Sequence, residues 1–256
     1  MLLENLAFPE VEAYLKEKDV ILIPVGSVEQ HSPYGLIGTD FIAAECIARE
    51  TGKRMGIMVA PTLAYGISPH HMAFSGSATL MPETLILVVG DIVKSFLSHG
   101  FRRIFFINGH GGNVNSIETG LQRLKADNYP GIFGMISWYD YPEMIDIGRE
   151  LFDGKEGSHA TPSEVAVTRC LRPKEFGTKA TIELEIEKPE HHWPLSAEEM
   201  RQFFPDGRMG SAPWLATESK GKMVIERSVD ALEKKLRKII AIPLTDSSKV
   251  QKQIRC

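Results

Sequence analysis

Short runs of consecutive apolar residues, each followed by a polar segment and then by helical periodicity, constrain the fold of this chain most. Residues 20–25, VILIPV, and residues 104–107, IFFI, are two such runs. A continuous apolar run is typical of a strand buried on both faces of a parallel sheet. Because strand-like and helix-like segments alternate from about residue 20, the sequence indicates βαβ units and an α/β fold with a mostly parallel sheet.

The expected elements follow one another without an internal repeat. We predict strands at 19–28, 57–63, 103–107 and 131–138, and helices at 40–50, 82–97, 114–125 and 228–241. The stretch 174–222 interrupts this alternation, because it is rich in Glu, Pro and Gly and has no period. We expect loops and short elements laid over the site there, and a single domain over residues 1–256.

Composition excludes several classes of function. The net charge is −4, whereas a nucleic-acid-binding protein usually has a basic surface. No apolar run approaches the ~18 residues that a membrane-spanning helix needs. Three cysteines without a CxxC pair argue against a disulfide framework or a thiolate zinc site. The N-terminal segment lacks the features of a signal peptide. We therefore expect a cytoplasmic protein that binds neither nucleic acid nor membrane.

Side chains that commonly bind metal ions occur where two of the predicted strands end. Glu29, His31 and Asp40 follow the first apolar run, and His110 follows the second. Open α/β sheets bind ligands at the carboxyl ends of their strands, and Glu29 and His31, two residues apart, would share one face of a strand. These carboxylates and imidazoles predict a metal site. The alternative is a polar turn, with Asp40 capping a helix that begins at Phe41.

Two further segments carry candidates with alternatives of their own. In residues 108–113, NGHGGN, the glycines beside the histidine let the backbone approach a ligand closely. A phosphate cradle is the rival interpretation, but no GxGxxG or GxxxxGK[ST] pattern is present. Asn113 can cap the helix that follows. Thr161 and Glu164 match a capping box, so Glu164 is either the partner of that cap or a ligand. His159, just before it, is either a loop histidine or a catalytic one.

Together these segments resemble the creatininase family of metal-dependent amidohydrolases. The similarity lies in PVGSVEQHSPYGLIGTD, GISPHHMAFSGSATL, INGHGGN, HATPSE and, more loosely, MGSAPWLATESKG, in the family's order between residues 24 and 222. Family members hydrolyse cyclic or linear amides. The resemblance implies a three-layer sandwich, with a mostly parallel central sheet flanked by helices, assembled as a homo-oligomer that is usually a hexamer.

The resemblance also implies a set of metal ligands. It places four residues at the family's ligand positions: Glu29, His31, Asp40 and His110. Asp40 would bridge two ions. Creatininase proper carries a glutamate ligand two residues after the histidine of the NGH motif, where this chain has Gly112. Glu164 is the natural replacement ligand, and the difference argues against creatinine itself as the substrate.

The predicted activity is hydrolysis of a small-molecule amide by two divalent ions per chain, Zn²⁺, Mn²⁺ or Fe²⁺. The ions would share a hydroxide nucleophile, and His and carboxylate ligands suit all three metals. His159 would donate a proton to the leaving nitrogen, and Glu164 is a second candidate catalytic residue. The side chains predicted to contact substrate are His71, Asn113, Trp138 and Trp214, with Tyr139, His192 and Trp193 as further pocket walls.

Two alternatives come from other classes of protein. A metal-dependent phosphoesterase would need basic residues converging on the site, yet Arg102 and Arg103 precede their strand at its far end. A non-catalytic binding protein on the same fold would hold a structural metal or none. It would hydrolyse no amide.

Overall fold

A computed structural model describes residues 1–244 of the chain. Its strands form one parallel sheet in the order β2-β1-β3-β4. The strands are β1 (Val20–Val25), β2 (Met58–Val59), β3 (Arg103–Asn108) and β4 (Ile132–Ser137). The strand order reverses between β1 and β3, and such a switch point leaves a crevice at the carboxyl ends of the strands.

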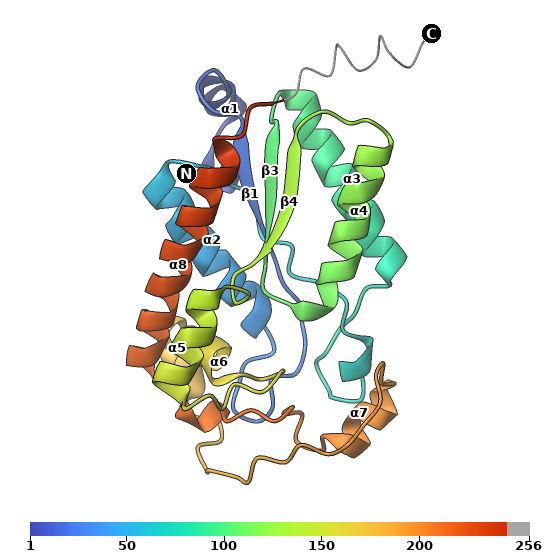
Figure 1. Cartoon of the computed structure of the whole chain (residues 1–256), viewed down its shortest axis with the longest axis vertical. Coiled ribbons are helices and arrows are strands. Elements are labelled where there is room, and N and C mark those ends of the chain that lie inside the picture. Colours follow the sequence, from blue (N-terminus) through green and yellow to red (C-terminus); the bar gives the residue numbers. More distant parts are fainter. Residues whose placement is uncertain (245–256) are drawn as a thin grey trace.

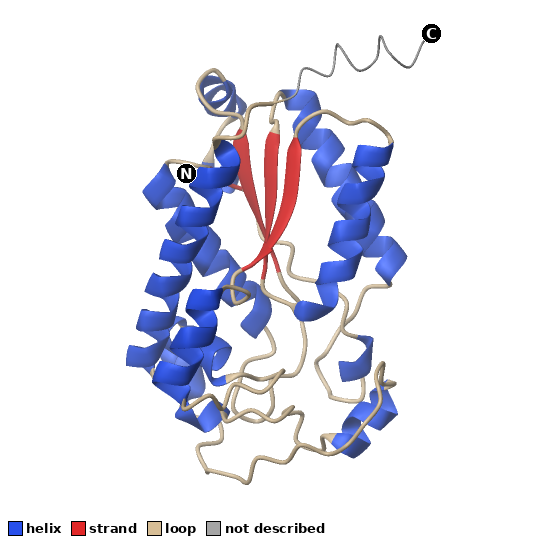
Figure 2. Ribbon diagram, in the orientation of Figure 1, coloured by secondary structure: helices blue, strands red, loops and turns tan. Residues whose placement is uncertain are grey.

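Helices lie on both sides of this sheet and complete a three-layer α/β sandwich (Figures 1 and 2). The helices on one side are α2 (Thr39–Met55), α5 (Pro142–Phe152), α6 (Pro162–Leu171) and α8 (Glu218–Ile240), and those on the other are α1 (Phe8–Leu15), α3 (Pro82–His99) and α4 (Val114–Ala126). Alternate residues of the strands enter the two cores: Leu22 and Phe105 face one, and Ile23 and Phe106 the other. The central strands are therefore buried on both faces, as their apolar runs predict.

The remaining elements are short. They are α7 (Ala197–Phe203) and the 3-10 turns η1 (Leu3–Asn5), η2 (Pro69–His71), η3 (Gly111–Asn113), η4 (Pro173–Phe176) and η5 (Pro213–Leu215). Loops join them through most of the stretch 174–222, which lies at the bottom of the view (Figure 1, yellow to orange). No helix within residues 1–244 has the length and apolar character needed to cross a bilayer.

Helices α1 and α5 are not among the predicted elements, and two predicted elements differ markedly in their bounds from the observed ones. The strand predicted at 57–63 is wrong in length, because the regular strand is only Met58–Val59. Leu63 forms an isolated bridge with Val25 of β1, and one extra residue before it interrupts the ladder. The last helix begins at Glu218 and not at 228, within the stretch expected to be irregular. Thr217 caps it by accepting a hydrogen bond from the Lys220 N–H at 3.2 Å. In the sequence, Gly221 suggests a break in the helix. In the structure it allows α8 to pack closely against α6, because a Cβ at this position would lie 2.0 Å from a backbone oxygen of α6.

Candidate metal centre

The candidate ligands meet at the switch point between β1 and β3. Strand β1 ends at Val25, and the loop that follows carries Glu29 and His31, whereas His110 follows the end of β3 at Asn108. All three side chains are buried. Glu29 and His31 thus converge because of the shape of a loop. The sequence prediction assumed that both residues lie on one face of a strand, but β1 ends before them.

Two glycines hold the first turn of α2 and with it Asp40. A Cβ at Gly26 would lie 2.3 Å from a backbone nitrogen of that turn, and a Cβ at Gly109 would lie 2.2 Å from the Asp40 carbonyl oxygen. Only glycine permits so close an approach of two backbones. Helix α2 begins at Thr39 with Gly38 at its N-cap and no side-chain cap. The alternative interpretation of Asp40 as a helix cap is therefore wrong.

Two groups of potential ligands share Asp40. Its Oδ2 atom lies 3.2 Å from His110 Nδ1, which is also 3.2 Å from Glu29 Oε1. Its Oδ1 atom lies 3.1 Å from His31 Nε2, which is 3.8 Å from Glu164 Oε1. Within each group, Glu29–Asp40–His110 or His31–Asp40–Glu164, the potential ligand atoms lie within 4.8 Å of one another. The two oxygens of one carboxylate thus face two different histidines.

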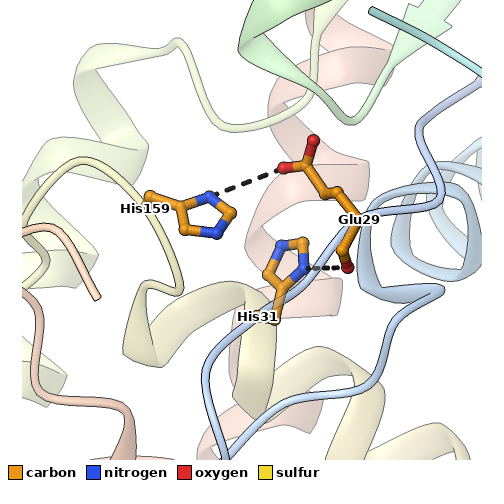
Figure 3. A group of neighbouring side chains, drawn as sticks. All are labelled: Glu29, His31 and His159. Carbon is orange, nitrogen blue, oxygen red and sulfur yellow. Dashed lines mark hydrogen bonds and ion pairs between the residues drawn. The ribbon is translucent and has the colours of Figure 1, made fainter. Parts of the chain in front are cut away.

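Backbone carbonyls orient both histidines. His31 Nδ1 lies 3.2 Å from the Glu29 carbonyl oxygen (Figure 3), and His110 Nε2 lies 2.8 Å from that of Ile67. Each of these nitrogens must donate a proton, so in the neutral ring the other nitrogen points its lone pair at carboxylates. A lone pair facing carboxylates is repulsive unless a proton or a cation lies between them. Histidines that bind metals are commonly oriented in this way.

Protonation of the histidines compensates the buried carboxylates. Burial alone would lower the pKa of His31, but Asp40, Glu164 and Glu29 raise it to about 10. Burial likewise opposes protonation of His110, yet Glu29 and Asp40 raise its pKa well above the ordinary value. Burial raises the pKa of Glu164 to about 7, although His31 opposes the shift. A metal ion that binds here must therefore displace protons.

Three buried atoms at this centre make no hydrogen bond of regular geometry among the described residues: Glu29 Oε2, His31 Nε2 and Asp40 Oδ2. His31 Nε2 and Asp40 Oδ2 each face an ion-pair partner, at 3.1 and 3.2 Å. Buried polar atoms are normally hydrogen bonded, and these three belong to the residues that converge on one point. Imidazole and carboxylate donors suit Zn²⁺, Mn²⁺ and Fe²⁺. The residues present therefore fit a divalent metal centre.

Glu164 meets both interpretations that the sequence leaves open. The capping box of α6 is formed, because Thr161 Oγ1 accepts from the Glu164 N–H at 3.3 Å and the Thr161 N–H donates to Glu164 Oε1. The same carboxylate oxygen lies 3.8 Å from His31 Nε2. Glu164 is thus both the partner of the helix cap and a potential ligand.

Gly112 leaves no room for a ligand of its own. A Cβ at this position would lie 2.1 Å from the Ile67 carbonyl oxygen and 2.5 Å from His110 Nε2. A glutamate there would displace the carbonyl group that orients the His110 ring. The local backbone therefore excludes a carboxylate at 112, and Glu164 is the one available on the His31 side of the centre.

Gln30 links two further histidines to the centre. The Nε2 atom of its side chain donates to the Gly207 carbonyl oxygen at 2.9 Å and lies 3.0 Å from both His71 Nδ1 and His159 Nε2, while its backbone carbonyl oxygen lies 2.7 Å from His159 Nε2. His159 Nε2 is thus a donor, and His159 Nδ1 faces Glu29 Oε1 at 3.5 Å (Figure 3). Burial lowers the pKa of both His71 and His159. This role of Gln30 could not be predicted from the sequence, because strand alternation would turn its side chain away from the site.

A strained turn follows His159. Ala160 has a φ of 52°, which is uncommon for a residue other than glycine. The His159 ring stacks on the His71 ring, with centroids 4.2 Å apart. Residues in sparsely populated backbone conformations cluster at functional sites. The strain at Ala160 is therefore consistent with a turn that aims His159 at Glu29.

A cavity of about 870 Å³ opens onto the candidate ligands. Its wall contains several residues that were predicted to surround a substrate: His71, Trp138, Tyr139 and Trp193. His70 also lines it, with the centroid of its ring 4.1 Å from that of His71. His192 is exposed instead and pairs with Glu199 at 3.3 Å. Trp214 is likewise absent from the wall, because it packs against Tyr34 and Arg208.

Asn113 is a buried cross-link. Its Oδ1 atom accepts a hydrogen bond from the Ile67 N–H, and its Nδ2 atom donates to the Gly26 carbonyl oxygen, both at 2.9 Å. Nδ2 also lies 3.3 Å from Asn108 Oδ1. The predicted helix cap is wrong, since the side chain makes no capping bond. The amide has no free hydrogen-bonding group left for a substrate, and Asn113 does not line the cavity.

Fold and site together define a class of protein. It is an α/β protein in which buried histidines and carboxylates, at the switch point of a parallel sheet, fit a divalent metal and open onto a cavity. Residues 4–236 match the creatininase family model, described as creatinine amidohydrolase. The chain belongs to the creatininase family, and it is an amidohydrolase, an enzyme that hydrolyses amide C–N bonds.

Individual relatives differ in their reactions. The chain is 25% identical to 3-dehydro-scyllo-inosose hydrolase of Thermotoga maritima, over 93% of this chain and 83% of that enzyme. It is 26% identical to creatinine amidohydrolase of Pseudomonas putida, over 91% and 95% of the two chains. The mycofactocin precursor peptide peptidase of Mycobacterium ulcerans is 34% identical over 42% of this chain and 46% of the peptidase.

Solved creatininase structures share the fold. One of a manganese form superimposes with a TM-score of 0.80 at 22% identity, covering 94% of this chain and 99% of that one. A Zn–Zn form of a creatininase variant gives the same TM-score and identity, with coverage of 94% and 98%. These similarities confirm the predicted three-layer α/β architecture.

Proposed function

We propose that this amidohydrolase binds two divalent ions per chain, Zn²⁺, Mn²⁺ or Fe²⁺, and uses them to hydrolyse a cyclic or linear amide. The observation that carries the proposal is the Asp40 carboxylate, whose Oδ1 atom faces His31 and whose Oδ2 atom faces His110. A carboxylate placed in this way can bridge two ions. The manganese and Zn–Zn forms of solved creatininases support the same choice of metals.

Each of the two ligand groups contains one of the two histidines. Glu29, Asp40 and His110 would hold one ion, and His31, Asp40 and Glu164 the other. Divalent ions in these positions supply the activation of water and of the amide carbonyl. His159 Nδ1 takes up the proton released by the attacking water and delivers it to the leaving nitrogen. Its Nε2–H bond to the Gln30 carbonyl oxygen leaves Nδ1 as the atom available for that transfer.

The residues of the wall do not favour a phosphoesterase. No lysine or arginine belongs to the described cavity wall, whereas a phosphate ester needs positive charge around its oxygens. Arg103 pairs with Asp19 at 2.6 Å, at the amino end of its strand. A non-catalytic scaffold has less support still, because the family consists of hydrolases. We do not propose creatinine as the substrate, since Gly112 replaces the family's ligand.

The family membership also supports a homo-oligomer, with the hexamer as the expected form, and a cytoplasmic enzyme of a single domain. Light scattering of the purified protein tests the assembly. A mass of about six chains is expected. A monomer at working concentration would contradict it.

The metal centre is tested by elemental mass spectrometry of purified protein and of a Glu164→Gln variant. Glutamine can replace glutamate in a capping box, so the exchange keeps the start of α6 and removes only the carboxylate ligand. We expect about two ions per chain in the parent and about one in the variant. Glu199→Gln is the matched control, because Glu199 closes the capping box of α7 away from the cavity. Failure of Zn²⁺, Mn²⁺ and Fe²⁺ all to bind the parent would refute the proposal.

A further inference from the structure

The cavity wall contains one carboxylate besides the candidate ligands, and no lysine or arginine among the described residues. Glu156 lines it in addition to the candidate ligands Glu29, Asp40 and Glu164, whereas no lysine or arginine does so among the described residues. Burial lowers the pKa of His70 to about 4, so that ring adds no positive charge near neutrality. A negatively charged group on a substrate would find no partner in this wall beyond the metal centre itself.

Apolar side chains form the outer part of the same wall. Ile145 of α5 is 57% exposed and Trp193 of the 174–222 stretch is 60% exposed, although both line the cavity. Met144 and Leu195, which neighbour them in the chain, also line the cavity and are buried in two separate hydrophobic clusters. Large apolar side chains that remain exposed around a concave site commonly mark a place where a ligand binds. We refer to these four residues as the apolar rim.

The apolar rim is continuous with the metal centre. The Trp193 ring meets the His70 ring edge-on, with centroids 5.1 Å apart, and His70 in turn lies 4.1 Å from His71. His71 Nε2 is 3.7 Å from Glu29 Oε1. A row of three rings therefore leads from the rim to a candidate ligand. The cavity volume of about 870 Å³ lies near the upper end of the ~300–1,000 Å³ range that accommodates drug-sized ligands.

We propose that this site selects amides that carry a bulky apolar group and no negative charge, with the apolar group bound by the rim. The inference rests on the proposed amidohydrolase function and adds a substrate class to it. Apolar contact with the rim would stabilise the bound substrate, whereas the described wall offers no lysine or arginine to pair with an acidic group in its place.

The test uses the metal-loaded enzyme and short amides that share one scissile bond. Each amide carries a benzyl group, a hydrogen or a carboxymethyl group next to that bond, and both orientations of the bond are included. We expect kcat/KM to be highest for the benzyl amide and roughly tenfold or more lower for the other two, the scale of selectivity that a hydrophobic pocket provides. Trp193→Ala and Ile145→Ser should remove this preference without loss of metal.

Ile182→Ser is the matched control, because Ile182 is 72% exposed and lies outside the cavity wall. This variant should keep the benzyl preference. Equal kcat/KM for all three amides, or a preference for the carboxymethyl amide, would overturn the inference and leave the proposed function standing. A protein that binds no divalent ion and hydrolyses none of the amides would overturn both.

Discussion

Asn113→Ala should destabilise the whole site through groups that never touch a substrate. The amide of Asn113 pairs with the Ile67 N–H and with the Gly26 carbonyl oxygen, and all three residues lie beside the candidate metal centre. The Ile67 carbonyl oxygen also orients His110. Alanine would leave two backbone groups without a partner in a buried setting, and it would loosen the loop that fixes the His110 ring.

The magnitude follows from the number of groups left unpaired. A buried donor or acceptor that loses its partner costs about 1–3 kcal/mol, so two such groups predict a loss of about 2–6 kcal/mol in the free energy of unfolding. Urea unfolding of the metal-free protein, followed by circular dichroism, measures this loss. Metal affinity should fall by about 10–100-fold, as is typical when a group that orients a ligand is removed.

Asn115→Ala is the control for this experiment. Asn115 lies on the same helix, α4, but it is exposed, so its exchange should change the free energy of unfolding by less than about 0.5 kcal/mol. The reasoning would be refuted if Asn113→Ala unfolded within that same margin of the parent. It would equally be refuted if both variants were destabilised alike.

Three further predictions concern the same centre. Gly112→Ala should weaken metal binding, measured by elemental analysis, because its Cβ would lie 2.1 Å from the Ile67 carbonyl oxygen; full metal content would contradict this. The free energy of unfolding of the metal-free protein should fall as the pH rises from about 6.5 towards 10, because folding raises the pKa of His31 to about 10 and stabilises its charged form; a flat profile in urea unfolding between pH 6 and 10 would contradict it. Gln30→Leu should lower kcat more than it changes KM, since His71 loses a hydrogen-bond partner; steady-state kinetics with the best amide found would show an unchanged kcat if this were wrong.

The strands could be predicted because burial on both faces leaves a clear sequence signal. The apolar runs of β1 and β3 needed no tertiary information, and their polar ends identified the right edge of the sheet. The prediction of β2 is too long because the apolar run 57–63 carries no sign of the extra residue that interrupts its ladder with β1 after Val59. The start of α8 was missed because Gly221 looks like a helix breaker until its contact with α6 is known.

The site could be predicted only in part, because spacing along the chain does not encode orientation. The sequence pointed to Glu29, His31, Asp40 and His110, which the structure brings together. It could not show that the Asn113 amide forms its hydrogen bonds with backbone groups, because these bonds depend on the packing of three loops.

Helix α8 carries none of the candidate ligands, yet it packs on both α2 and α6, the helices that begin beside Asp40 and Glu164. During synthesis every candidate ligand leaves the ribosome before this helix does. The surfaces of α2 and α6 that contact α8 stay uncovered until α8 packs on them. The candidate metal centre should therefore form late, and metal should bind only after all of its ligands have been synthesised. A chain that ends at residue 217 holds all the candidate ligands, and we expect it to retain markedly less metal than the full chain. Equal metal retention would show that the candidate metal centre forms without helix α8.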